Sequence, residues 1–161
     1  MDIASEVGVS ATKKLTLFNK TPLMSTYIVC FATGDLQFIE TNSFRIPVRV
    51  IATTDKDIEQ GRRALELAAR TLDTFEKIFD IPFPLPKMDI ISISNNQGAM
   101  ENWGLITFTE SRLLVDEEKS SANAWRSASK TIVHEIAHQW FGNIVWINPP
   151  FGPLMNDGDS Y

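Results

Sequence analysis

Apolar and polar positions change their period along this chain. Between residues 15 and 52, short apolar runs alternate with Thr-Pro, Gly-Asp and Thr-Asn-Ser stretches that are typical of turns. We expect strands at the runs LTLF, MSTYIVCFAT, LQFIE and FRIPVRVIA. Residues 1–14 are small and polar with no usable period, so a loose N-terminal end is expected there.

The period becomes helical after this run of strands. Apolar residues recur at mostly helical spacing over residues 58–79, and either Asp55 or Asp57 can cap the first turn. The prolines of residues 80–86 stop the pattern. The apolar stripe predicts a helix that packs against a core.

Two further strands and a second helix complete the pattern. The strands are expected at residues 88–94 and 104–110, joined by a glycine-containing link. The second helix is expected to begin at a cap on Ser120 or Ser121 and to end near Phe141. Strands followed by helices and more strands predict an α+β fold.

Composition limits the class of protein. The chain has 161 residues, of which 43% are hydrophobic and 22% charged, which suits one folded domain of ordinary size. A formal net charge of -5 argues against a nucleic-acid partner or an acidic membrane surface. Because Cys30 is the only cysteine, an internal disulfide is excluded and a cytoplasmic location is expected. No signal sequence is visible, and no run approaches the roughly 18 apolar residues of a membrane span.

The only two histidines of the sequence, His134 and His138, lie on the second predicted helix. Side chains four positions apart on a helix are about 6 Å from each other, so both imidazoles can reach one zinc ion at roughly 2.1 Å. Glu135 is rotated by about 100° from His134, beside the ion, where it can act on a water molecule. Ser127 and Thr131 fall in the same arc of the helix.

A catalytic zinc ion normally takes three protein ligands and leaves one position for water. The sequence has no third histidine, so the third ligand is expected to be a carboxylate. The candidates are Glu101, Glu110, Asp157 and Asp159, with Cys30 less favoured.

Two motifs together resemble the M1 zinc aminopeptidases, the gluzincin group that includes the puromycin-sensitive and fungal cytosolic enzymes. They are GAMENWGLITF at residues 98–108 and VHEIAHQWFGN at residues 133–143. The resemblance implies that residues 1–45 are the end of an N-terminal β domain. Residues 46–161 would be the N-terminal part of a thermolysin-like catalytic domain with a zinc-binding HEXXH helix. The chain would then be a fragment of a longer protein.

The resemblance also implies a role for each motif residue. His134 and His138 would bind Zn²⁺, and Glu135 would take a proton from the zinc-bound water. Asp157 would be the third ligand, because the family has a glutamate at this distance from the second histidine. The residues implied to bind substrate are Gly98, Ala99, Met100, Glu101 and Asn102, with Glu101 pairing with the free α-ammonium of a peptide.

The implied function is zinc-dependent removal of N-terminal residues from peptides with a free N-terminus. The alternative is a truncated, non-catalytic homologue that binds at most zinc or peptide. Two departures favour this alternative. Pro149 and Pro150 replace a pair of tryptophans of the family, and a tyrosine that the family uses further downstream has no match here.

Overall fold

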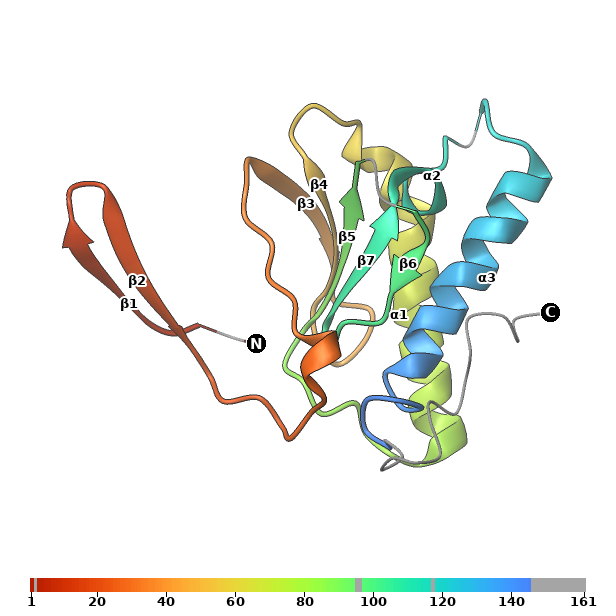
Figure 1. The fold of residues 1–161 in the computed structure, drawn as a ribbon. Coiled ribbons are helices and arrows are strands. Elements are labelled where there is room, and N and C mark those ends of the chain that lie inside the picture. The colour runs from red at the N-terminus through yellow and green to blue at the C-terminus, as the bar shows by residue number, and fades with distance from the viewer. Residues whose placement is uncertain (2, 95–96, 117, 146–161) are drawn as a thin grey trace.

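The computed structural model describes residues 1, 3–94, 97–116 and 118–145 (Figure 1). Its centre is a five-stranded sheet with the order β3-β4-β5-β7-β6. The strands are β3 (Leu36–Thr41), β4 (Val48–Thr53), β5 (Met88–Ile93), β6 (Ala99–Met100) and β7 (Leu105–Thr109). β4, β5 and β7 are parallel, whereas β3 and β6 are antiparallel edge strands.

The helices cover one face of this sheet (Figure 1). α1 (Arg62–Phe79) follows the short 3-10 helix η2 (Ile58–Gly61) and forms the crossover between β4 and β5, as parallel strands require. α2 (Glu110–Leu113) is a single turn after β7, and α3 (Ala122–His138) packs against α1 and α2. The mixture of strands and helices expected from the pattern is therefore confirmed.

The helix caps follow from the sequence. Asp57 caps η2 by accepting a hydrogen bond from the backbone of Glu59, and Ser121 caps α3 by accepting one from Ala124. α3 ends at His138 rather than near Phe141, and irregular turns carry the chain onward. Gly142 adopts a left-handed φ of 115° there.

An aromatic cluster closes the core beneath the end of α3. The Trp140 indole is buried, and its Nε1 donates a hydrogen bond to the Ile81 carbonyl at 2.9 Å. The rings of Phe75, Phe79 and Phe83 pack around it at centroid distances of 6.1, 5.7 and 5.9 Å. This packing fixes the C-terminal end of α3 against the end of α1.

Two expectations for the N-terminal third are wrong. Residues 1–14 are not a loose end, because β1 (Ile3–Ser10) pairs with β2 (Lys13–Phe18) in an exposed hairpin. The reason is a period of two, since Val7 and Val9 alternate with polar residues and Val7 lies opposite Leu15.

The second wrong expectation is the strand at MSTYIVCFAT. Apart from the short 3-10 helix η1 (Thr26–Ile28), this segment is irregular. Met24, Ile28 and Cys30 face the side of the sheet that is turned away from α1 and α3, whereas Phe31 is exposed, and the segment pairs with no strand edge.

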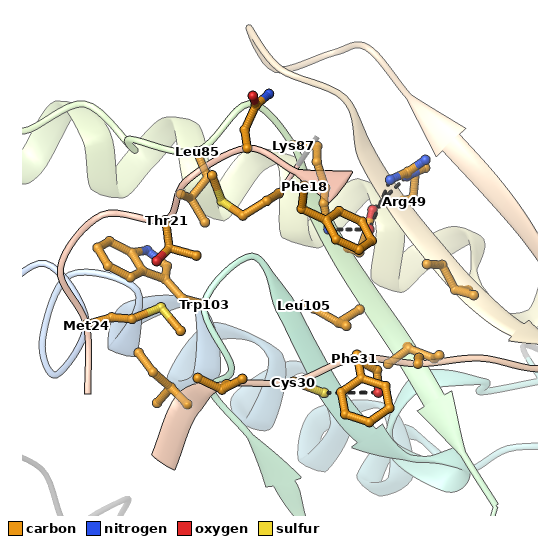
Figure 2. Close-up of a pocket in the computed structure, with 18 of the residues that line it drawn as sticks. Phe18, Thr21, Met24, Cys30, Phe31, Arg49, Leu85, Lys87, Trp103 and Leu105 are labelled. Atoms are coloured by element: carbon orange, nitrogen blue, oxygen red, sulfur yellow. Dashed lines mark hydrogen bonds and ion pairs between the residues drawn. The ribbon is translucent and has the colours of Figure 1, made fainter. Parts of the chain in front are cut away.

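A cavity of about 590 Å³ lies between this segment and the sheet (Figure 2). Met24 and Cys30 line it from the segment, and Leu105 and Trp103 line it from the sheet side. Its charged groups satisfy one another, since the Asp89 carboxylate accepts hydrogen bonds from both Arg49 and Lys87. Within the described residues, no helix is long and apolar enough to cross a membrane.

Candidate metal and peptide site

The last turns of α3 bring the two histidine side chains together. The Nε2 atoms of His134 and His138 lie 3.1 Å apart, and the rings meet edge to face with centroids 4.6 Å apart. This arrangement follows from the four-residue spacing, which places both side chains on one side of the helix.

The same geometry fits a zinc ion. Two nitrogen atoms that each lie about 2.1 Å from a tetrahedral ion are about 3.4 Å apart, close to the observed separation. The Nδ1 atom of His138 is 3.0 Å from the Phe141 carbonyl, which can only accept a hydrogen bond. In a neutral imidazole this contact assigns the proton to Nδ1 and leaves the Nε2 lone pair for a metal. This partner could not be predicted from the sequence, because it depends on the turn that follows α3.

The third ligand is not found within the described part of the chain. There, no group of three His, Cys, Asp or Glu side chains could hold a metal ion. Glu101, Glu110 and Cys30 therefore do not complete the set. Asp157 and Asp159 lie outside the described residues.

A cavity of about 440 Å³ opens beside the histidines. It lies among α3, α2 and the stretch that leads into β6, and its lining is mainly polar. The lining residues are Gln97, Gly98, Ala99, Arg112, Ser127, Lys130, Thr131, His134 and Glu135. The arc predicted from the helical wheel thus faces one cavity, except that His138 does not line it. Glu135 and His138 are only 5% and 4% exposed.

The predicted substrate-binding residues lie on and beside the short edge strand β6. Ala99 pairs with Phe108 and Met100 with Thr107, so the motif is held by β7 on one side. The Gly98 carbonyl accepts a hydrogen bond from the Thr109 backbone at 2.8 Å. Only Gly98 and Ala99 of the five predicted residues line the cavity.

Two buried amide side chains connect the motif to α3. The Glu101 carbonyl accepts hydrogen bonds from Gln139 Nε2 at 3.1 Å and from Asn143 Nδ2 at 3.0 Å. Gln139 is fully buried, and its Oε1 accepts a third bond from the Gly104 backbone at 3.1 Å. Its Nε2 also lies 3.3 Å from the Glu135 carbonyl. Gln139 therefore ties both motifs together.

Tyr27 reaches the site from the N-terminal third. Burial, together with the neighbouring carboxylate of Glu101, raises the pKa of its hydroxyl. The sequence did not point to Tyr27, Gln139 or Asn143. For Gln139 and Asn143, the only indication in the sequence was that they are polar residues shortly after the second histidine.

The comparisons with known proteins agree with the motifs. Residues 63–149 match the peptidase family M1 domain. The chain belongs to peptidase family M1. Both motifs lie within the matched stretch.

Relatives from two kingdoms carry aminopeptidase names. The alanine/arginine aminopeptidase of Saccharomyces cerevisiae is 48% identical over 159 residues, which are 98% of this chain and 18% of the relative. The mitochondrial aminopeptidase 2 of the same yeast is 45% identical, over 98% of this chain and 16% of its own length. Endoplasmic reticulum aminopeptidase 1 of Homo sapiens is 44% identical, over 86% of this chain and 16% of the relative. The chain thus spans less than a fifth of the length of these family M1 proteins.

Proposed function

We propose that this chain is part of a zinc-dependent aminopeptidase that removes the N-terminal residue from peptides with a free N-terminus. His134 and His138 would hold the Zn²⁺, with Asp157 as the third ligand. The observation that carries the proposal is the pair of Nε2 atoms 3.1 Å apart, with the Nδ1 proton of His138 held by a carbonyl.

The other motif residues would handle the peptide. A bound zinc ion would lower the pKa of water to near 7 and polarise the peptide carbonyl. Glu135 would accept a proton from the attacking water and return it to the leaving amine, as a general base and then a general acid. Glu101 would pair with the α-ammonium of the peptide, and the rest of residues 98–102 would line its backbone. The tie from Gln139 to the Glu101 backbone supports this division of work.

The domain assignment and the location belong to the same proposal. Residues 1–45 would be part of an N-terminal β domain, and residues 46–161 part of a thermolysin-like metallopeptidase domain. A cytoplasmic location is supported by the single cysteine, Cys30, which is free.

The second candidate is a non-catalytic homologue that binds at most zinc or peptide. It is favoured by the sequence after Asn143, where Pro149 and Pro150 stand in place of a pair of tryptophans of the family. Its metal affinity would be lower than that of a site with three ligands.

Zinc titration of the purified chain tests the metal site. We expect one zinc ion per chain, with binding abolished in His134→Ala and weakened in Asp157→Ala, because each removes a direct ligand. Glu110→Ala is the matched control, because this carboxylate pairs with Lys56 and lies outside the proposed set. Equal binding by the wild-type chain and His134→Ala would exclude this site.

Hydrolysis separates the two candidates. An aminopeptidase would cleave aminoacyl anilides when zinc is bound and so release their chromophore. It would leave the N-acetylated anilides intact, because they have no free amine. Glu135→Gln should bind zinc and leave the anilides intact. A zinc-loaded wild-type chain that cleaves none of them would establish the non-catalytic candidate.

A further inference from the structure

Two cationic side chains line the cavity beside the histidines. Arg112 reaches it from α2, and Lys130 lies on α3 one turn before His134. In the part of the chain that the structure describes, neither forms a salt bridge with a carboxylate. The cavity therefore holds two cationic side chains beside one carboxylate, that of Glu135, on a chain whose net charge is -5.

The two cations are held differently. Arg112 is half-buried, and its Nη1 donates a hydrogen bond to Thr131 Oγ1 at 2.6 Å. This bond fixes the guanidinium at the wall and leaves its other N–H groups available to an acceptor. Lys130 is exposed and can move its ammonium group across the opening. An anion in the cavity would thus meet one fixed and one mobile cation.

The direction of β6 shows which part of a peptide would reach these cations. Glu101 lies at one end of β6, whereas Gly98 and Gln97 lie at the other end and line the cavity. Extended residues rise about 3.3 Å each, so Glu101 and Gly98 are separated by roughly 10 Å along the strand. A peptide with its amine at Glu101 and its backbone along this strand would place its second or third residue at the cavity.

We propose that Arg112 and Lys130 bind a carboxylate on the leaving side of the peptide. The carboxylate is either the C-terminus of a short peptide or an acidic side chain just after the cleaved bond. The inference rests on the proposed function in so far as the ligand is taken to be a peptide that is cleaved after its first residue. It predicts that peptides with such a group bind more tightly than neutral ones of the same shape.

The experiment compares matched peptides by calorimetry on the zinc-loaded Glu135→Gln chain, which prevents turnover. The affinities of Leu-Glu-Ala-amide and Leu-Gln-Ala-amide differ only through the acidic side chain, so their comparison tests a side-chain carboxylate. The affinities of Leu-Gln-Ala with a free C-terminus and of Leu-Gln-Ala-amide test the C-terminal carboxylate. We expect about fivefold tighter binding for at least one acidic member, a preference that falls with salt. Lys130→Met and Arg112→Leu should each reduce it, whereas Lys20→Met removes an equal charge on the remote N-terminal segment and should not.

The peptide comparisons and the cavity variants distinguish failure of the carboxylate site from failure of the proposed function. An equal affinity for acidic and neutral peptides, or a preference that survives both cavity variants, would overturn the carboxylate site. If the preference depends on Lys130 but ignores zinc removal and N-acetylation, the carboxylate site stands and the aminopeptidase proposal fails. If no peptide binds, both fail. Circular dichroism of each variant verifies that it is folded, and Arg112→Lys should restore binding if Arg112→Leu does not fold.

Discussion

Replacing Gln139 by Met should destabilise the chain more than the loss of an ordinary buried amide. Methionine has a similar length and flexibility, so it fills the space and leaves little cavity. What disappears is the set of contacts to the backbone of Gly104, Glu101 and Glu135, at 3.1, 3.1 and 3.3 Å. The loss therefore measures the connection between the two motifs.

The size of the effect follows from the partners that remain. The Glu101 carbonyl keeps its bond from Asn143, but the buried Gly104 N–H loses its side-chain acceptor. A buried donor without an acceptor costs about 1–3 kcal/mol and each further lost bond about 1 kcal/mol. With two such further bonds lost, we expect Gln139→Met to lower the free energy of unfolding by roughly 3–5 kcal/mol, read from urea midpoints at constant slope.

Gln37→Met is the matched control for this measurement. The Gln37 amide also donates two bonds to carbonyls, of Thr53 and Lys56 at 3.0 and 2.7 Å, but it is only partly buried, so water can replace it. Its loss should cost less than about 1 kcal/mol. Equal shifts in the two variants would refute the reasoning that Gln139 is a structural tie.

Two further predictions concern the backbone and pH. Gly104→Ala should lower the free energy of unfolding by about 2–3 kcal/mol, because φ is 73° and the new Cβ would lie 2.6 Å from Leu85 Cδ1. Gly98→Ala should lower it by only about 1 kcal/mol, because φ is 83° but the new Cβ meets nothing within 4 Å. Thermal melts that give the reverse order of stability would contradict this. The Arg45 guanidinium holds the pKa of Glu76 below its ordinary value of 4.5, so the ion pair stabilises the fold above that pH and is lost as the pH falls. Glu76→Gln should therefore narrow the difference in melting temperature between pH 7 and pH 3, and an unchanged difference would assign the acid sensitivity elsewhere.

The elements with a strong local signal were predictable. The stripe over residues 58–79 predicted η2, which Asp57 caps, and α1, and the runs at β5 and β7 predicted buried strands. The strand at LTLF lies in β2 and was predicted, but its partner β1 was missed because glycine and serine interrupt the period of two. The run at residues 24–33 was misjudged because an apolar segment can cover a sheet as well as extend it. That choice depends on which edges of the sheet are open, and no local pattern records this.

The site divides in the same way. The pairing of His134 with His138 follows from helix geometry alone, so their spacing was sufficient. The carbonyl partner of His138 depends on the irregular turn that follows α3, and the role of Gln139 depends on the end of strand β6, which comes from a distant part of the sequence. Asp157, the ligand predicted from the resemblance, lies outside the described residues and stays a prediction.

Different residues should therefore control zinc binding and the selection of the peptide bond in the proposed enzyme. The metal pair is set within one helix, so its geometry should survive changes in the strands. The distance from the metal pair to Glu101 is set by Gln139 and Asn143, which hold the Glu101 carbonyl from the end of that helix. In an aminopeptidase this distance decides which peptide bond reaches the metal, because the bound amine fixes the start of the peptide. Substitution of Gln139 or Asn143 should therefore change the ratio of the affinities for peptides with a free and an acetylated N-terminus, while the affinity for zinc stays the same.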